Sequence, residues 1–424
     1  MSSFWAQKAI DFEPTMKVWE EIFFKIPELG FKEVLTRKKV LELAHTFNLK
    51  ITQDYGINGF SITIGEGYPH IGLMAEMDAL VVPDHPNASE IDHAAHACGH
   101  HLQTVILLST LSLYDKYRNL SLKGSVTFYF VAAEEYVDLQ YRRSLKEKGS
   151  IKLFSGKQNL ILEEAFKDID VILSCHTMGK TSLPMIELNS KLSGFIHKTL
   201  TFNGKSSHAA VAPHLGVNAL NAMVLTQNAI ALLRETFQEK DMIRVHLMNS
   251  LGGQSINAVP SKVILEGYVR SINPESLKRV NEAIDQAAIH CSQALGATCD
   301  IHDEPGYLPL IQSESLNEVL RPHALELVSQ EGILDHQAGF ASGDIGDVSL
   351  FIPTIQFGFS GCKGLVHGSD FYMDKSQEAL VNPVILYLES IDDLLSNPVK
   401  VVEIKKSFVP TMNLVEYKKL HHID

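Results

Sequence analysis

Apolar residues in the first part of the chain alternate between helical and strand periods. Residues 14–26, opening at Pro14, and residues 32–47 carry apolar positions at helical spacing. Strands are predicted at 57–65 and 70–77, with the turn Gly65-Glu66-Gly67 between them. A helix is predicted at about 101–117, and further strands at 125–135 and 169–176. Strands that alternate with helices predict an α/β domain, a mainly parallel sheet with helices on both faces.

Residues 195–304 follow a different order. We predict strand 195–203, helix 214–235, strands 242–250 and 261–271, helix 274–295 and strand 298–303. Asn273 is the expected N-cap of the second helix, with Pro274 in its first turn and Gly296 just past its end. This order predicts a ferredoxin-like α+β domain. We therefore expect a domain at 191–305, inserted into a larger domain made of 1–190 and 306–424.

Composition narrows the class of protein. The chain has 424 residues, 45% hydrophobic and 21% charged, which is ordinary for a soluble globular protein. Its net charge of −13 argues against nucleic acid or an anionic membrane as the main partner. The five cysteines are scattered and odd in number, and the N-terminal residues lack a signal-peptide pattern, so we expect a cytoplasmic location. The most apolar helical stretch, LQTVILLSTLSLY, is too short and too polar to span a bilayer.

The densest cluster of reactive side chains is the segment from His93 to His101. Cys98 and His100, two residues apart on the loop that enters a helix, can both face one metal ion, and thiolate with imidazole suits zinc and its neighbours. Two alternatives stay open for this segment alone. The first alternative to a metal site is a histidine-rich surface loop. The second is a Cys98 nucleophile that a histidine activates.

Further candidates follow strands or lie in loops of the same α/β domain. Glu134 and Glu135 end an apolar strand, where one carboxylate can bind a metal while the other faces water as a general base. An acidic pair is otherwise a solvated surface feature. His176 ends a buried strand and His367 follows Gly364-Leu365-Val366, and each alone has a structural interpretation. Together these residues supply enough ligands for two metal ions that share a bridge.

Short motifs in a characteristic order carry a family resemblance over nearly the whole chain. They are Pro27-Glu28-Leu29-Gly30-Phe31, Met77-Asp78-Ala79-Leu80, His96-Ala-Cys98-Gly-His100, Ala133-Glu134-Glu135, Gly204-Lys-Ser-Ser-His208, Ile256-Asn257-Ala-Val-Pro260, Gly267-Tyr-Val-Arg270, Gly343-Asp344-Ile-Gly-Asp347-Val-Ser349 and His367. The sequence resembles the dinuclear aminoacylase/carboxypeptidase family of metallopeptidases. The likeness is greatest to its amidohydrolase branch, which includes hippurate, auxin-conjugate and p-aminobenzoyl-glutamate hydrolases.

The resemblance implies a role for each matching residue. The implied metal ligands are Cys98, His100, Glu135, His176 and His367. Glu134 becomes the general base, and Asp78 the carboxylate that orients a ligand. His208, in the inserted domain, would help to stabilise the oxyanion. Asn257 and Arg270 would contact the substrate carboxylate, although both also have a structural interpretation.

The implied enzyme is a metal-dependent amidohydrolase. We expect two divalent ions, zinc first with manganese or cobalt as alternatives, and a small N-acyl or N-aroyl amino acid or short peptide as substrate. The inserted domain would act as a lid and form a homodimer. The rival interpretations are a dipeptidase or carboxypeptidase of the same fold and a non-catalytic binding protein. Two features depart from the family pattern: His101 replaces a common Asp or Asn, and the segment after Glu135 lacks a glycine-rich continuation.

Overall fold

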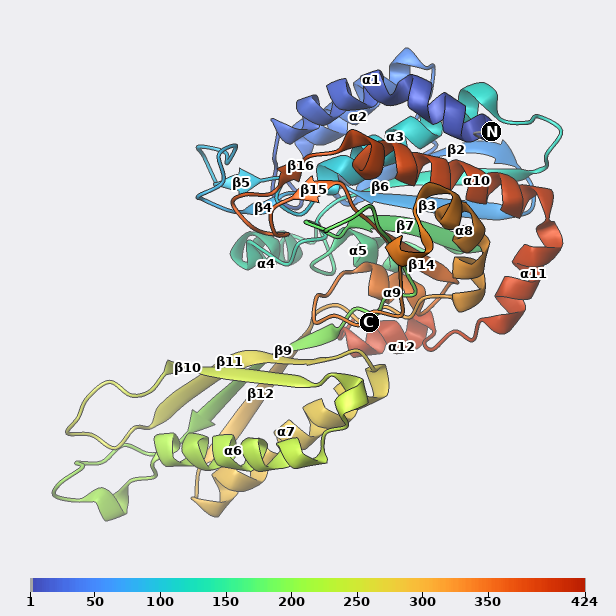
Figure 1. The fold of residues 1–424 in the computed structure, drawn as a ribbon. Coiled ribbons are helices and arrows are strands. Elements are labelled where there is room, and N and C mark those ends of the chain that lie inside the picture. Colours follow the sequence, from blue (N-terminus) through green and yellow to red (C-terminus); the bar gives the residue numbers. More distant parts are fainter. Residues whose placement is uncertain (1–2, 424) are drawn as a thin grey trace. The chain divides into compact units, whose positions relative to one another are not determined.

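An eight-stranded sheet is the centre of the larger of two structural units. The computed structural model describes residues 3–423, and this larger unit comprises residues up to 191 together with 311–337 and 347 onward (Figure 1). The strands lie in the order β1-β2-β6-β3-β7-β14-β8-β13. Their bounds are β1 Gln53–Asp54, β2 Gly59–Glu66, β3 His70–Glu76, β6 Gly124–Val131, β7 Val171–Thr177, β8 Ile186–Leu188, β13 Ile333–Asp335 and β14 Thr354–Phe359.

The four central strands all run in the same direction. β6 pairs with β3, β3 with β7, and β7 with β14, each in parallel register. The strand β8 adds to β14 in antiparallel register, and β2 adds to β6 in the same way. The predicted mainly parallel sheet is therefore confirmed. The carboxyl ends of β3, β6, β7 and β14 meet at one edge, where ligand sites gather in such sheets.

Helices cover both faces of this sheet. α1, α2, α3 and α10 lie on one face and α5 and α12 on the other (Figure 1). The helices with their bounds are α1 Phe4–Phe24, α2 Val34–Thr46, α3 His100–Tyr117, α4 Leu139–Glu147, α5 Gly156–Leu162, α8 Glu314–Leu327, α9 Ile345–Ser349, α10 Asn382–Ser396, α11 Pro398–Ser407 and α12 Leu414–Leu420. The short strands β4 Leu80–Val81, β5 Ala94–Ala95, β15 Cys362–Lys363 and β16 Tyr372–Met373 pair two by two. Within residues 3–423 no helix is both long and apolar enough to cross a membrane.

The first helix corrects one prediction. The sequence placed its start at Pro14, whereas α1 begins at Phe4, capped by the Ser3 hydroxyl, which accepts from the Ala6 N–H. Pro14 lies inside the helix, where it removes one hydrogen bond. The burial of Trp5 and Ala9 before the proline, and of further apolar residues after it, offsets that loss. Tertiary packing therefore overrides the local signal.

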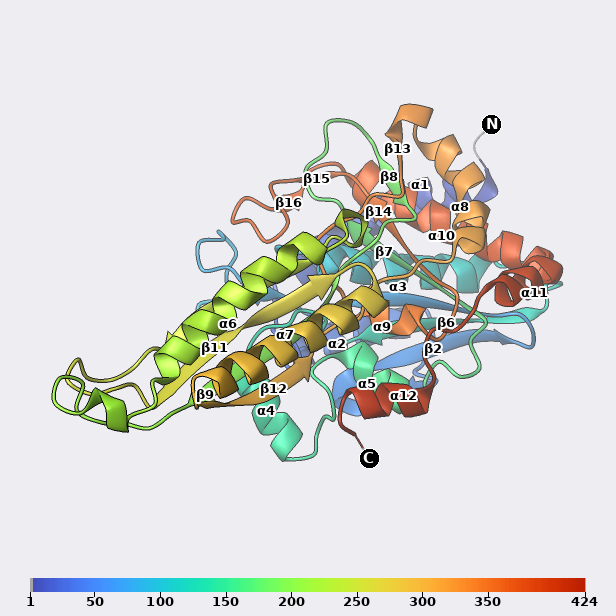
Figure 2. The ribbon, with the colours of Figure 1, turned by 90° about the horizontal axis from the view of Figure 1, so that it is seen from below.

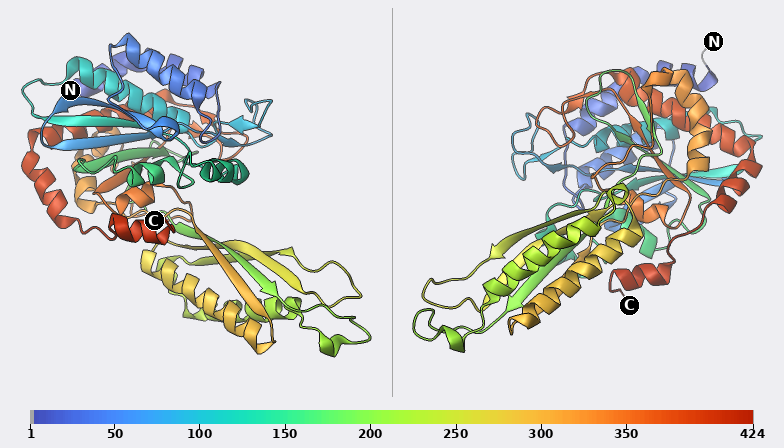
Figure 3. Two further views of the ribbon diagram at one scale, coloured as in Figure 1. Left: turned by 180° about the vertical axis from the view of Figure 1, so that it is seen from behind. Right: turned by 60° about the horizontal axis from the view of Figure 1, so that its bottom comes forward.

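The second unit comprises residues 192–310 and 338–346, so it includes a short segment beyond the predicted 191–305. Its elements are β9 Gly194–Asn203, α6 Ala219–Leu233, β10 Arg244–Leu251, β11 Lys262–Ser271, α7 Pro274–Ala294 and β12 Thr298–Pro305. The four strands are antiparallel, in the order β10-β11-β9-β12. α6 and α7 run side by side along one face of this sheet (Figures 2 and 3). The predicted ferredoxin-like order is confirmed.

Candidate metal centre

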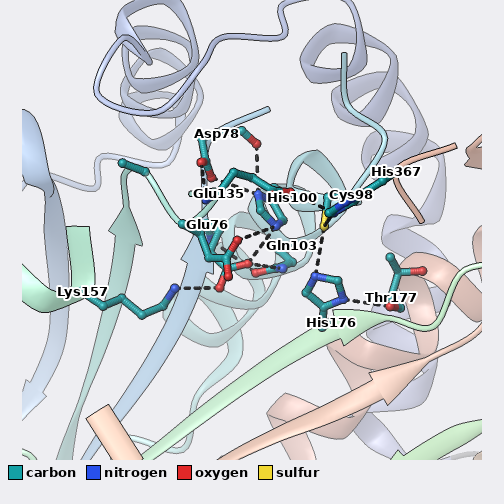
Figure 4. A network of polar contacts seen from close by, with 12 residues as sticks. Glu76, Asp78, Cys98, His100, Gln103, Glu135, Lys157, His176, Thr177 and His367 are labelled. Atoms are coloured by element: carbon teal, nitrogen blue, oxygen red, sulfur yellow. Dashed lines mark hydrogen bonds and ion pairs between the residues drawn. The ribbon is translucent and has the colours of Figure 1, made fainter. Parts of the chain in front are cut away.

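The candidate ligands of the larger unit converge at the carboxyl-end edge of its parallel strands (Figure 4). Glu134 and Glu135 follow β6, and His176 is the second-last residue of β7. Cys98 and His100 lie at the start of α3, and His367 lies between β15 and β16. The His367 N–H donates to the Ala97 carbonyl at 2.7 Å, which holds this distant loop beside Cys98. Residues that are far apart in the sequence therefore share one site.

Gly99 makes the turn between two candidate ligands, Cys98 before α3 and His100 at its start. Its φ of 87° lies in the left-handed region, which favours glycine. A Cβ at this position would lie 2.6 Å from the Thr177 Cγ2, which is too close. Gly99 thus allows Cys98 and His100 to enter the same site against the end of β7.

The turn after β6 has a strained backbone. Ala133 has a φ of 57°, which is uncommon for a residue with a side chain. Its N–H donates to the Glu33 carboxylate at 2.7 Å, which helps to hold this conformation. Such strain is concentrated at functional sites. Here it lies directly before the paired carboxylates Glu134 and Glu135.

The Cys98 sulfur is the atom that two groups of donors have in common. Its Sγ lies 3.4 Å from the His176 Nε2 and 3.3 Å from the His367 Nε2, and the Glu135 Oε1 lies 3.3 Å from that same His367 nitrogen. Donor atoms of Cys98, His100 and His176 lie within 4.8 Å of one another, as do those of Cys98, Glu135 and His367. Two groups of donors that share the Cys98 sulfur would be able to hold two divalent ions.

Asp78 forms hydrogen bonds with two of these candidate ligands, through the His100 Nδ1 and the Glu135 backbone N–H. The His100 Nδ1 donates to the Asp78 Oδ1 at 3.0 Å, because the neighbouring Asp78 carbonyl at 3.1 Å can only accept. The Glu135 N–H donates to the Asp78 Oδ2 at 2.9 Å. The His100 Nε2 and the Glu135 Oε1 are then left buried without a hydrogen bond. Both atoms carry lone pairs and face the Cys98 sulfur and neighbouring imidazoles. A divalent cation would bind to atoms placed in this way.

Electrostatics favour ionised carboxylates and a protonated free thiol in this site. Burial opposes the charge of Glu135, but the adjacent His367 imidazole and the nearby His100 outweigh it and lower its pKa to about 2. Burial raises the pKa of the Cys98 thiol well above its usual value, and the Glu135 carboxylate adds to the effect. These surroundings alone do not produce the thiolate that a cysteine nucleophile needs, whereas a coordinating thiol is deprotonated by the cation that it binds.

Sequence reasoning missed three residues beside His100. The Glu76 Oε2 lies 3.1 Å from the His100 Nε2, and its Oε1 accepts from the Lys157 Nζ at 2.7 Å. The Gln103 Nε2 donates to the Oε2 at 2.7 Å. Burial opposes the charge of Glu76, but Lys157 and His100 lower its pKa to about 2. The available signal was the strand period, because Glu76 precedes Asp78 by two positions and such residues share a side.

The two departures from the family pattern have structural explanations. His101 turns toward α1: its Nε2 lies 3.4 Å from the Glu20 Oε1, and its ring packs against Phe24 at 5.1 Å. The segment after Glu135 continues into α4, from which the buried Arg142 guanidinium donates to the Glu135 carbonyl. The Arg142 side chain therefore supports the Glu135 backbone, in a segment that lacks the glycine-rich continuation of the family.

The remaining candidates, His208, Asn257 and Arg270, lie in the inserted unit. His208 and Asn257 are exposed on adjoining loops, joined by a hydrogen bond from the Ala209 N–H to the Asn257 carbonyl at 2.9 Å. Arg270 lies near the opposite end of β11, eight residues from Lys262, or roughly 26 Å at ~3.3 Å per residue. Its guanidinium donates to the Phe340 carbonyl at 2.8 Å. Within this unit, then, His208 and Asn257 are neighbours, and Arg270 is not close to them.

Comparisons with known proteins identify the family of the chain. The family model for Peptidase family M20/M25/M40 matches residues 72–392. IAA-amino acid hydrolase ILR1-like 2 of Arabidopsis thaliana is 26% identical over 348 residues, 79% of this chain and 73% of that protein. One of the chains of the p-aminobenzoyl-glutamate hydrolase of Escherichia coli is 25% identical over 281 residues, 64% of this chain and 53% of that protein.

The fold has a solved counterpart. A dinuclear metal-binding peptidase of the M20 family from Bacillus subtilis superposes with a TM-score of 0.69 at 20% identity, covering 91% of this chain and 99% of the other. The resemblance inferred from the short motifs is confirmed. The chain therefore belongs to Peptidase family M20/M25/M40, hydrolases that act on amide and peptide bonds.

Proposed function

We propose that this protein is a metal-dependent amidohydrolase that cleaves the amide bond of an N-acyl or N-aroyl amino acid. The observation that carries the proposal is the donor set around Cys98, which is buried except for the half-buried His176 and the exposed His367, with its two orphaned atoms on His100 and Glu135. The names of two relatives, an IAA-amino acid hydrolase and a p-aminobenzoyl-glutamate hydrolase, describe amino acid conjugates of this class. The substrate would present a free carboxylate beside the scissile amide.

The proposed ligands of two divalent ions are Cys98, His100, Glu135, His176 and His367. Nitrogen, sulfur and carboxylate donors in one site favour zinc, with manganese or cobalt as alternatives. When bound, such ions lower the pKa of water toward ~7 and polarise a carbonyl. Asp78 would orient His100 and Glu135, in keeping with its two hydrogen bonds to them.

Glu134 is the proposed general base. It follows the strained Ala133, and its Oε2 lies 3.9 Å from the His100 Nε2, so its carboxylate faces the donor set. Glu134 would take the proton of the attacking water and pass it to the leaving amine. The adjacent carboxylates would then divide the labour, Glu135 as a ligand and Glu134 as the base.

The inserted unit is the proposed lid and the interface of a homodimer, and His208 is its proposed oxyanion donor. The His208 Nδ1 accepts from the Ala210 and Val211 N–H groups, each at 3.2 Å. A neutral imidazole that accepts at Nδ1 carries its proton at Nε2, and an exposed Nε2–H is a donor that an oxyanion can use. Asn257 and Arg270 are the proposed contacts of the substrate carboxylate. Because they lie toward opposite ends of β11, both would reach one carboxylate only from different subunits of the proposed homodimer.

A hydrolysis screen tests the function. The purified protein, stripped and then reloaded with Zn²⁺, Mn²⁺ or Co²⁺, is offered N-acyl amino acids, p-aminobenzoyl-glutamate and dipeptides. We expect turnover of the acyl or aroyl amino acids and none in the presence of a chelator. Turnover of dipeptides alone would overturn the proposed substrate class and favour the dipeptidase alternative. Full activity after exhaustive chelation would overturn the metal-dependent mechanism.

A further inference from the structure

A fully buried ion pair adjoins the proposed metal centre and takes no part in the function described so far. The Lys157 side chain is 0% exposed and that of Glu76 is 2% exposed, with 2.7 Å between the Nζ and the Oε1 (Figure 4). Burying both charges is costly unless their geometry is good and further hydrogen bonds satisfy their remaining polar atoms. Lys157 also lies in the first turn of α5, where the helix dipole disfavours a cation. The Glu76 carboxylate therefore offsets part of the cost of placing Lys157 here.

The second carboxylate oxygen of Glu76 faces the proposed ligands. Its Oε2 lies 3.1 Å from the His100 Nε2, the ring nitrogen that Asp78 leaves free and that has no hydrogen bond. Two ligand atoms ~2.1 Å from one ion, at angles of ~90–110°, lie roughly 3.0–3.4 Å apart. The separation of these two atoms thus matches a pair of ligands on one ion.

The remaining contacts of Glu76 hold its carboxylate in this orientation. The Gln103 Nε2 donates to the Oε2 and the Lys157 Nζ to the Oε1, and the Thr104 hydroxyl donates to the Glu76 carbonyl. A carboxylate oxygen has two lone pairs, so the Oε2 can accept from Gln103 and still bind a cation. A pair that only joined α5 to the sheet would not need an oxygen directed at His100.

We propose that Glu76 is a sixth protein ligand, bound to the ion that His100 holds, and that Lys157 is the positioning residue that directs its carboxylate there. This inference rests on the proposed metal-dependent function. It adds one anionic oxygen to a donor set in which His100 is otherwise accompanied by Cys98 and His176. The Lys157 ammonium offsets the added charge, so that the site still suits divalent cations.

The experiment measures metal binding directly, apart from turnover. Apo-protein is titrated with Co²⁺, and with Zn²⁺ in competition with a chelator, for the wild type and for Glu76→Gln. We expect two equivalents in the wild type, and in the variant an at least ~10-fold weaker affinity at one of them. The visible Co²⁺ bands of that site should change, while the thiolate-to-cobalt charge-transfer band from Cys98 persists. Equal affinities and an unchanged spectrum in a folded variant would overturn the proposal.

The matched control is Asp170→Asn. Asp170 is also a buried carboxylate paired with a lysine, Lys405, and it accepts from the His70 N–H at 2.8 Å. It lies at the amino end of β7, away from the proposed site, so its loss should leave both metal affinities unchanged. Equal weakening in both variants would mean that Glu76 acts through stability alone, which overturns its role as a ligand. A wild type that binds no metal would instead refute the proposed function.

Two more variants keep the test decisive. If Glu76→Gln does not fold, Glu76→Asp keeps the charge beside Lys157 but withdraws the oxygen from His100, and it should weaken the same site. Lys157→Met should weaken that site less than Glu76→Gln. Added to Glu76→Gln, it should cause no further loss of metal affinity, because its proposed effect on the metal passes through the Glu76 carboxylate. An additive loss would overturn the positioning role of Lys157.

Discussion

Replacing Asp78 with Asn removes one of two acceptors that the site uses at once. Both carboxylate oxygens accept, one from the His100 Nδ1 and one from the Glu135 N–H. An amide offers one acceptor oxygen and one NH₂ group. One of the two donors, the His100 Nδ1–H or the Glu135 N–H, would therefore face the NH₂ group. If the NH₂ faces His100, the imidazole must carry its proton at Nε2, which blocks the nitrogen that would bind the metal. If it faces Glu135, that ligand is displaced instead.

The magnitude follows from the unsatisfied donor. Leaving a buried donor unpaired costs ~1–3 kcal/mol, which corresponds to roughly 5- to 150-fold in an equilibrium constant at ~1.4 kcal/mol per tenfold. We therefore expect Asp78→Asn to weaken metal binding by ~10–100-fold. Activity should return in part at high metal concentration.

The assay is a chelator-competition titration of Zn²⁺, with turnover followed against free metal. Asp170→Asn is the control, because both its carboxylate oxygens also accept hydrogen bonds but lie at the other sheet edge. That variant should lose stability and keep its metal affinity. An Asp78→Asn protein with wild-type affinity for both equivalents would refute the assigned role of Asp78.

Four further outcomes are expected. Glu134→Gln should keep its metal content and lose ~10²-fold or more in turnover, whereas a loss of metal measured by mass spectrometry would reverse the assignment of the acidic pair. Chelation should abolish activity and added metal restore it, and a trapped acyl group on Cys98 would contradict its role as a ligand. His208→Ala should lower turnover by ~10²-fold with metal retained, and mixing it with Glu134→Gln chains should recover activity if His208 acts across a dimer. Burial raises the pKa of Glu20 to about 7, so between pH ~4.5 and ~7 the folded state binds more protons than the unfolded state. The free energy of unfolding should therefore fall by about 3 kcal/mol as the pH rises through that range. Glu20→Gln should remove this fall in unfolding experiments at pH 5 and 8, and an unchanged pH dependence would contradict the expectation.

The sequence predicts the frame of the fold and most of the candidate metal donors, because those signals are local. The periods of β3, β6 and β7 and the caps of α7 depend on neighbouring residues, and Glu134-Glu135 directly follows its strand. The residues that escaped prediction depend on long-range contacts. Lys157 meets Glu76 across 81 positions, and the start of α1 depends on what Trp5 packs against.

The place of β14 in the sheet has a consequence for synthesis on the ribosome. β14 lies between β7 and β8, yet its residues 354–359 emerge long after both of these strands and after residues 192–310 of the inserted unit. Until then one edge of the buried strand β7 has no partner, and an unpaired apolar edge is a template for aggregation. We therefore expect nascent chains that stop before residue 354 to depend on chaperones, while residues 192–310 can already begin to fold.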